Sequence, residues 1–219
     1  MDRVVIGYVH PGVVRAEFMR SMLNTVTANR DTVEAVISVQ SGPLLATARN
    51  DLVQMFLADH RAAWLWMVDT DMVFTPEAVT RLIQAADPDK RPIMGGLCFS
   101  DGPDGPEPVL YDLSEAAGGG VAFGKYTVWP EGDVMPVGGT GAACLLVHRS
   151  VYKKIRAGWA PGKSDPVFPW FRESSIAGRR ALGEDLTFCL RAQSAGIPIH
   201  VHTGVQVGHM KTHMLGKVS

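Results

Sequence analysis

The sequence has few cysteines, no long hydrophobic run and no excess of charge of either sign, and each absence excludes a class of protein. Its three cysteines, Cys98, Cys144 and Cys189, are odd in number and lack metal-knuckle spacing, so we expect reduced, mostly buried thiols in a cytoplasmic protein. No apolar stretch approaches the ~20 residues that a membrane helix needs. The N-terminus also lacks a basic leader and an apolar run of signal-peptide length. We therefore expect a soluble chain without integral membrane contact.

The charges nearly cancel, with 21 lysines and arginines against 22 aspartates and glutamates. This balance argues against a domain built mainly to coat nucleic acid or an anionic membrane, because both need a basic surface. The 219 residues, of which 46% are hydrophobic and 20% charged, have globular composition. We expect residues 1–219 to form a single domain, and homo-oligomerisation is left open.

The first hundred residues alternate between buried apolar runs and segments of helical periodicity. The pattern predicts strands at 4–9, 33–39, 64–68 and 93–99, separated by helices at 15–27, at 44–59 and from Thr75 onward. Such alternation is typical of a mostly parallel central sheet flanked by helices. The fold class predicted for this half is therefore α/β.

The pattern changes after residue 100. A segment rich in glycine, proline and aspartate, 100–108, precedes strand-like pieces at 109–113 and 121–128, which indicate a small antiparallel excursion. Further strands are expected at 142–148 and 197–202, with a helix opening at Gly183. The segment 159–175 is predicted to be a loop whose aromatic side chains either stack on a sugar or a base or form a hydrophobic lid.

Asp69 and Asp71 follow the apolar strand Trp64-Leu65-Trp66-Met67-Val68. Residues two apart on an extended chain point to the same side, and two carboxylates beside a buried strand are costly unless a charge pairs them. Carboxylate oxygens suit Mg²⁺ or Mn²⁺, and ligands of open α/β sheets gather at the carboxyl ends of the strands. The alternative is a turn in which both aspartates cap backbone amides.

Two further polar groups are candidates. Glu184 and Asp185 lie in the first turn of a predicted helix, where they either complement the helix dipole or supply a general base. His209 and His213, near the end of the chain, either belong to a solvated tail or supply an imidazole ligand to the metal.

In their order along the chain, these motifs resemble the GT-A glycosyltransferase family, especially its compact bacterial and phage-type members. The resemblance rests on the Asp-x-Asp after a strand, the segment Gly138-Gly139-Thr140-Gly141 before another, the Glu-Asp helix and the late Gly-His, and it covers residues 4 to about 211. It implies a Rossmann-like GT-A fold, with a nucleotide-binding half at 1–100 and a sugar- and acceptor-binding half at 101–219.

The resemblance also implies a role for each candidate residue. Asp185 would face the acceptor as the catalytic base, with Glu184 as the alternate. Arg49 would bind the diphosphate through its forked guanidinium, and its alternative is a helix-surface salt bridge with Asp51 or Asp59. The cation, Mn²⁺ or Mg²⁺, would be held by Asp69, Asp71 and His209, with His213 as a substitute for the histidine. The nucleotide-sugar would contact His10, Pro11, Arg49, Asn50, Asp69, Gly139 and Gly141.

The activity implied is transfer of a hexose from a UDP- or GDP-sugar to a hydroxyl of a glycan, a protein or a modified base, by inversion or by retention. Two other functions are weighed against it. A sugar-nucleotide nucleotidyltransferase usually carries a Gly-x-Gly-Thr-Arg loop after the first strand, where this chain has His10-Pro11-Gly12. A non-catalytic carbohydrate- or nucleotide-binding module is disfavoured by the acids at 69, 71, 184 and 185.

Overall fold

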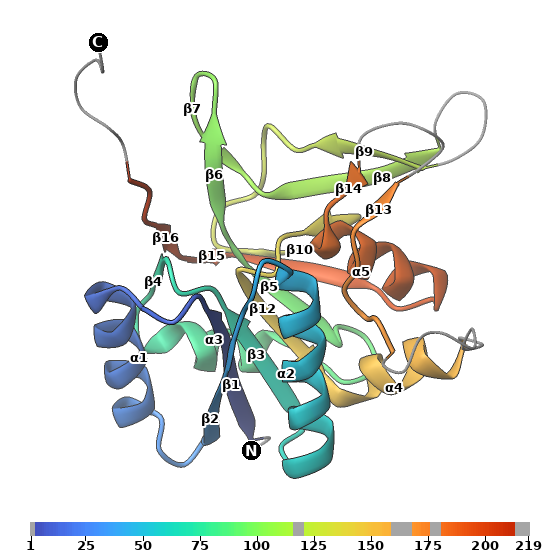
Figure 1. Ribbon diagram of the computed structural model, residues 1–219. Helices are drawn as coiled ribbons and strands as arrows, with labels where there is room; N and C mark the ends of the chain where they lie inside the picture. The colour runs from blue at the N-terminus through green and yellow to red at the C-terminus, as the bar shows by residue number, and fades with distance from the viewer. Residues whose placement is uncertain (1–2, 116–120, 159–167, 176–180, 213–219) are drawn as a thin grey trace.

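The centre of the molecule is a seven-stranded sheet with helices on both faces (Figure 1). The computed structural model describes residues 3–115, 121–158, 168–175 and 181–212. In spatial order the strands of this sheet are β10 (Val134–Val137), β15 (Ile199–Gln206), β5 (Ile93–Leu97), β12 (Cys144–His148), β3 (Trp64–Val68), β1 (Val4–His10) and β2 (Val33–Gln40).

Most of these strands are parallel, as the alternation in the sequence predicted. Strands β2, β1 and β3 run together, and β15 runs with β5. Strand β12 is antiparallel to both of its neighbours, β3 and β5, and β10 is antiparallel to β15. Because β12 runs in reverse, its first residues lie at the edge where the parallel strands end. An apolar strand buried on both faces reads the same in either direction, so the sequence pattern did not reveal this reversal.

Helices cover both faces of the sheet, and strand periodicity decides which side chains they meet. Along β1 and β3, Val4, Ile6 and Trp66 face α1 (Ala16–Ala28) and α3 (Glu77–Ala85) in one core. Val5 and Met67, one position away, face a second core with α2 (Leu45–Asp59), α4 (Arg149–Ala157) and α5 (Glu184–Ser194). Successive strand residues point to opposite faces, so the continuous apolar runs fill both cores.

Short antiparallel pairs stand at the edge where the parallel strands end. They are β6 (Phe99–Gly102) with β7 (Gly105–Pro108), β8 (Leu110–Glu115) with β9 (Val121–Lys125) and β11 (Gly139–Thr140), β13 (Ser174–Ser175) with β14 (Ala181–Leu182), and β4 (Met72–Val73) with β16 (Gly208–His209). The antiparallel excursion is therefore confirmed. The segment 100–108 belongs to a hairpin, whose turn is permitted by Gly105 at φ 128°.

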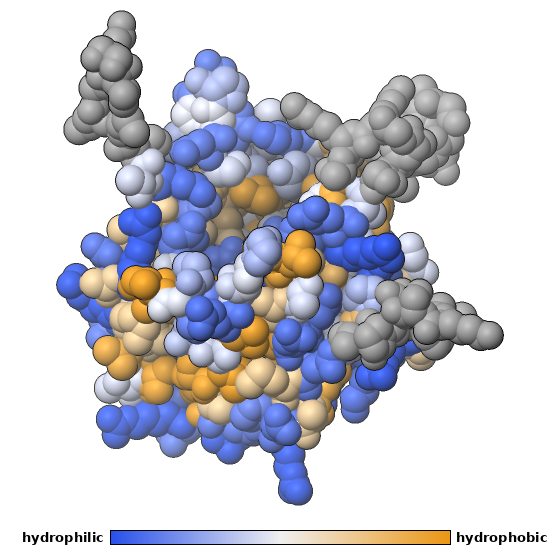
Figure 2. All heavy atoms as spheres, in the orientation of Figure 1, coloured by the Kyte–Doolittle hydropathy of each residue, from blue (hydrophilic) through white to orange (hydrophobic). Residues whose placement is uncertain are grey.

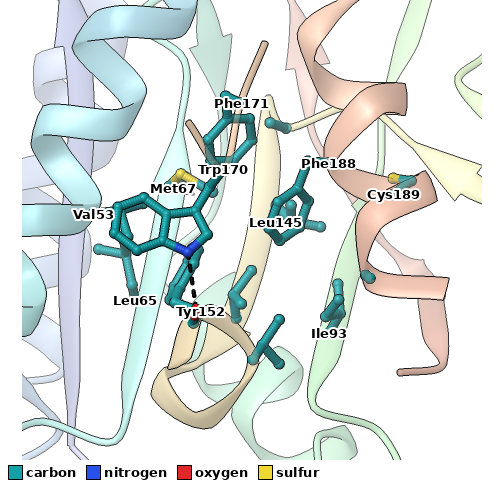
Figure 3. Close-up of a cluster of buried hydrophobic side chains, with 14 of the residues drawn as sticks. Val53, Leu65, Met67, Ile93, Leu145, Tyr152, Trp170, Phe171, Phe188 and Cys189 are labelled. Atoms are coloured by element: carbon teal, nitrogen blue, oxygen red, sulfur yellow. Dashed lines mark hydrogen bonds between the residues drawn. The ribbon is translucent and has the colours of Figure 1, made fainter. Parts of the chain in front are cut away.

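The aromatic segment before α5 is part of the core (Figure 3). Phe168, Trp170 and Phe171 are exposed at 6%, 0% and 1%. The indole nitrogen of Trp170 donates to the carbonyl of Tyr152 at 2.9 Å, and the Phe171 ring stacks on Phe188 with centroids 4.7 Å apart. The prediction that these rings stack on a ligand or form a lid is wrong, because each packs inside the protein. Trp159 of the same predicted loop lies outside the described residues.

The face shown in Figure 2 has an apolar area surrounded by polar residues. Hydrophobic residues gather there between α1 and α2, where β2 forms the edge of the sheet. Exposed apolar side chains of β2 and α2 include Val36, Leu45 and Met55. Among the described helices, none has the length and apolar character needed to cross a membrane.

Replacing Trp170 with alanine should lower the free energy of unfolding by about 3–5 kcal/mol, because it removes a fully buried ring and leaves a cavity. Urea denaturation followed by fluorescence or circular dichroism measures this. Val128→Ala, at a side chain exposed at 80%, is the control and should stay within about 0.5 kcal/mol of the wild type. A Trp170→Ala protein of unchanged stability would contradict the assignment of this segment to the core.

Candidate active site

The predicted site residues gather at one edge of the sheet because of how the chain runs. His10 ends β1 and Asp69 directly follows β3, so both lie at the carboxyl edge of the parallel strands. Gly141 precedes the reversed strand β12 and comes to the same edge. Helices α2 and α5 begin there with Arg49 and Glu184 in or near their first turns. This is where open α/β sheets bind ligands.

Arg49 is the centre of the polar network at this edge. Its side chain is 3% exposed, and its guanidinium bonds to three carboxylates from distant parts of the sequence. Nη2 donates to both oxygens of Asp69, at 2.9 and 3.0 Å. Nη1 donates to Glu184 at 3.0 Å and also to Asp185. The alternative of a surface salt bridge is wrong: Arg49 is buried, and within the described residues it pairs with neither Asp51 nor Asp59.

The charges in this network do not balance, since one guanidinium faces three carboxylates. Burial lowers the pKa of Arg49, but the charges of Asp69, Asp185 and Glu184 outweigh it and raise that pKa above its usual range. Burial raises the pKa of Asp69, and the nearby charge of Arg49 offsets this rise only in part. Burial and the charge of Asp185 raise the pKa of Glu184 to about 7. Glu184 thus titrates near neutral pH.

Asp71 forms a second polar pair with His209. Strand β16 pairs with β4 immediately after Asp71, and Met210 N donates to the Asp71 carbonyl at 2.8 Å, which brings the two side chains together. His209 Nε2 lies 2.9 Å from Asp71 Oδ2. His209 Nδ1 lies 2.7 Å from the carbonyl oxygen of Phe99. A carbonyl oxygen only accepts, so Nδ1 donates to it, and Nε2 is the ring nitrogen that faces Asp71.

The structure brings together only two of the three predicted metal ligands. Asp71 and His209 are in contact, whereas both oxygens of Asp69 accept from Arg49. Within the described ranges, no group of three or more His, Cys, Asp or Glu side chains is arranged to hold a metal ion. The carboxylate of Asp69 is instead paired with the buried guanidinium of Arg49. The substitute ligand, His213, lies outside the described residues.

Packing explains part of the glycine-rich segment. A Cβ added to Gly139 would lie 2.9 Å from Leu186 and 3.0 Å from the Phe123 ring, so protein atoms fill the side of Gly139 on which a side chain would lie. Gly141 differs, because its added Cβ would lie 3.6 Å from Oδ2 of Asp185. Gly141 therefore lies beside the carboxylate network, whereas Gly139 packs against Leu186 of α5.

Asn50, beside Arg49, is engaged by the main chain of Phe171. Its amide nitrogen donates to the Phe171 carbonyl at 2.8 Å, and its oxygen accepts from the Phe171 amide at 2.9 Å. Asn50 is 6% exposed. Its side chain is therefore committed to holding the aromatic segment, and the prediction that it faces a nucleotide is not supported by these contacts.

The predicted base-binding residues have local contacts. His10 Nδ1 accepts from the amide of Gly12 at 3.1 Å, and the His10 carbonyl accepts from the amide of Ser41 at 2.9 Å. Pro11 is exposed beside it. His10 and Pro11 thus lie at the end of β1, where solvent reaches Pro11. Their role in binding a nucleotide stays a prediction.

Two basic residues near Asp71 were not identified from the sequence. Lys211 Nζ lies 3.9 Å from Asp71 Oδ2. Arg15, before α1, donates to the hydroxyl of Thr212 at 2.8 Å and so ties the segment after β16 to α1. Two-residue strands such as β4 and β16 leave no periodic signal, so nothing in the sequence pattern pointed to this pairing.

Comparison with known proteins gives matches at the level of structure. No protein-family model matches the chain, and no curated protein sequence matches it. The crystal structure of A197 from STIV matches with a TM-score of 0.55 and 15% identity, over 96% of this chain and 86% of that one. A structure of GalNAc-T7 with UDP, GalNAc and Mn²⁺ matches with a TM-score of 0.60 and 12% identity, over 95% of this chain.

This chain covers 44% of the GalNAc-T7 chain, so it corresponds to less than half of that protein. At such low identities the likeness concerns the fold alone. The central, mostly parallel sheet of seven strands, flanked by helices and small antiparallel sheets, is consistent with a GT-A fold. Together with both structural matches, it identifies the architecture of this chain as GT-A-like.

Proposed function

We propose that the protein is a metal-dependent glycosyltransferase that moves a sugar from a nucleoside-diphosphate sugar to a hydroxyl acceptor. The observation that carries the proposal is the pair formed by Asp71 and His209, 2.9 Å apart, on the edge that also holds the Glu184–Asp185 carboxylates. A GT-A-like fold with a metal-ligating pair and a carboxyl pair at the same edge has the parts that this reaction needs.

The donor atoms of Asp71 and His209 fit a divalent cation. A carboxylate oxygen and a neutral imidazole nitrogen both bind Mn²⁺ well, and Mg²⁺ accepts the carboxylate. The Phe99 carbonyl accepts from His209 Nδ1 and fixes the ring, as hydrogen-bond partners of metal-binding histidines commonly do. Asp71 and His209 would hold the cation, and the donor and water would supply its other ligands. When bound, the cation supplies positive charge that offsets the charge developing on the leaving diphosphate.

A carboxylate of this protein can take the proton that the acceptor hydroxyl loses. The acceptor hydroxyl attacks the anomeric carbon, the bond from that carbon to the diphosphate oxygen breaks, and the hydroxyl proton passes to a carboxylate. We assign that carboxylate to Asp185, which is more exposed than Glu184, at 29% against 16%, and lies beside Gly141. Glu184 is the neighbour that exchanges a proton near neutral pH.

The identity of the donor is supported by the GalNAc-T7 structure, which contains UDP, GalNAc and Mn²⁺. A UDP- or GDP-sugar and Mn²⁺ are therefore the first substrates to test. Release of free nucleoside diphosphate from such donors, dependent on Mn²⁺ and faster with a hydroxyl acceptor, is the expected result. Formation of pyrophosphate from a nucleoside triphosphate and a sugar phosphate would instead favour a nucleotidyltransferase. Tight donor binding without turnover would favour a binding module.

Removing either side chain of the Asp71–His209 pair should weaken Mn²⁺-dependent binding of UDP or GDP. We expect Asp71→Asn and His209→Gln each to raise the dissociation constant about tenfold or more, since even outer-shell changes cost that much at metal sites. Isothermal titration with and without Mn²⁺ measures it. Asp51→Asn and His60→Gln, elsewhere on the molecule, are the matched controls and should bind as the wild type does. Wild-type affinity in Asp71→Asn would argue against the cation site.

The rate of transfer should rise with pH between about 6 and 8, because the pKa of Glu184 is raised to about 7 and a protonated Glu184 occupies Asp185 through their side-chain hydrogen bond. Asp185→Asn should lower kcat about 10²- to 10⁴-fold with little change in donor affinity. A pH series of kcat and KM for each protein measures both. An Asp185→Asn enzyme of normal kcat would remove Asp185 from the role of base, and a rate that falls over this pH range would contradict the influence of Glu184 on it.

A further inference from the structure

Arg49 has no terminal nitrogen left for a substrate. Nη2 is taken by both oxygens of Asp69, and Nη1 by Glu184 and Asp185. The guanidinium carbon also lies 5.9 Å from the centre of the Phe171 ring, which covers it from one side. At 3% exposure, the side chain is enclosed by the protein.

We propose that Arg49 is a positioning residue, which holds the Glu184–Asp185 carboxyl pair against Asp69 and keeps that pair able to accept a proton, and which does not bind the diphosphate. The inference rests on the proposed function for its catalytic meaning. Its structural part, a cation that fixes three carboxylates in one arrangement, stands on the contacts alone.

The charges around the carboxyl pair explain why a cation is needed there. Two adjacent carboxylates in a partly buried site repel each other, which favours the protonated form and removes the base. Arg49 of α2 is the cation that opposes this, and Asp69 after β3 adds a third negative charge. Of the other elements packed on α5, β11 contributes Gly139 and Thr140, α4 carries Arg149, Lys153, Lys154 and Arg156, and β15 carries His200 and His202. None of these groups is among the charges that shift Glu184.

The geometry also explains why an arginine serves here. A planar guanidinium binds Asp69 with one nitrogen and the carboxyl pair with the other, so one side chain spans both sides of the site. Asn50, the next residue, fixes the main chain of Phe171, whose ring covers the guanidinium. Arg49 and Asn50 thus position the segments around the carboxyl pair from the start of α2.

Recruiting Arg49 to a diphosphate would break these contacts. Breaking a buried ion pair leaves uncompensated charge in the protein, which is strongly unfavourable. A phosphate-binding arginine therefore predicts that its loss weakens nucleotide binding, whereas a positioning arginine predicts that its loss changes the titration of the carboxyl pair. The two roles are separable by measurement.

The first measurement is the titration of Glu184 in the whole chain, followed by carbon-13 NMR of its side-chain carboxyl. Arg49→Met should raise the pKa of Glu184 by about one unit or more, because an opposing charge is lost. Asp185→Asn should move it down, because a like charge is lost. Arg49→Lys keeps the charge but not the fork, so it should give a smaller rise than Arg49→Met and serves if the methionine variant does not fold. A structural effect alone does not produce shifts of opposite sign.

The second measurement is the affinity for UDP and for GDP with Mn²⁺. Arg49→Lys should bind within about twofold of the wild type, as should the control Arg3→Lys at an exposed ion pair with Glu34. In the transfer assay Arg49→Lys should lower kcat and shift the pH profile upward, with little change in donor KM. An unchanged Glu184 titration in both Arg49 variants, or a loss of nucleotide affinity of tenfold or more in Arg49→Lys, overturns the proposal.

The two proposals fail in different ways. If Glu184 titrates as expected but no sugar donor turns over, the positioning of the carboxyl pair holds and the glycosyltransferase function is wrong. If donors turn over but Glu184 does not respond to Arg49, the function holds and the positioning role is wrong.

Discussion

The buried guanidinium of Arg49 is the constraint on which the candidate site depends. It contacts carboxylates contributed by the end of β3 and by the start of α5, segments more than a hundred residues apart in the sequence. Because the guanidinium is enclosed, removing its charge leaves three carboxylates without a cation, which is strongly unfavourable. The arrangement of Asp69, Glu184 and Asp185 is therefore fixed by one side chain of α2.

A second constraint acts on the other side of the site. The pairing of β4 with β16 brings the segment near the end of the described chain back to Asp71 and sets His209 against it. The Phe99 carbonyl fixes the ring, and Arg15 ties the following residues to α1. Different segments of the chain therefore hold the two polar networks in place. One presents a carboxylate and an imidazole, side chains suited to a cation, and in the other, burial and the charge of Asp185 raise the pKa of Glu184 to about 7.

Much of the fold was predictable because burial leaves a periodic signal. The run Trp64–Val68 is apolar at every position and Val4–His10 is mostly so, since both faces of the sheet are covered, and the helices between them repeat at helical spacing. The direction of β12 was not predictable, because a strand buried on both faces has no polar side to orient it. The aromatic residues around Trp170 were misread for a related reason. The N–H of Trp170 donates to a carbonyl of α4, a partner that local spacing in the sequence does not indicate.

The sequence by itself determined the order of strands and helices, the two acids after β3 and the two at the start of α5, because these follow from local spacing along the chain. The tertiary structure decided what those acids do. In the folded chain Arg49 binds Asp69, and His209 contacts Asp71. The side chain of Asn50 is hydrogen-bonded to the main chain of Phe171. The physical reason is that a buried charge or amide must find a partner, and which partner is within reach is set by packing between segments far apart in sequence.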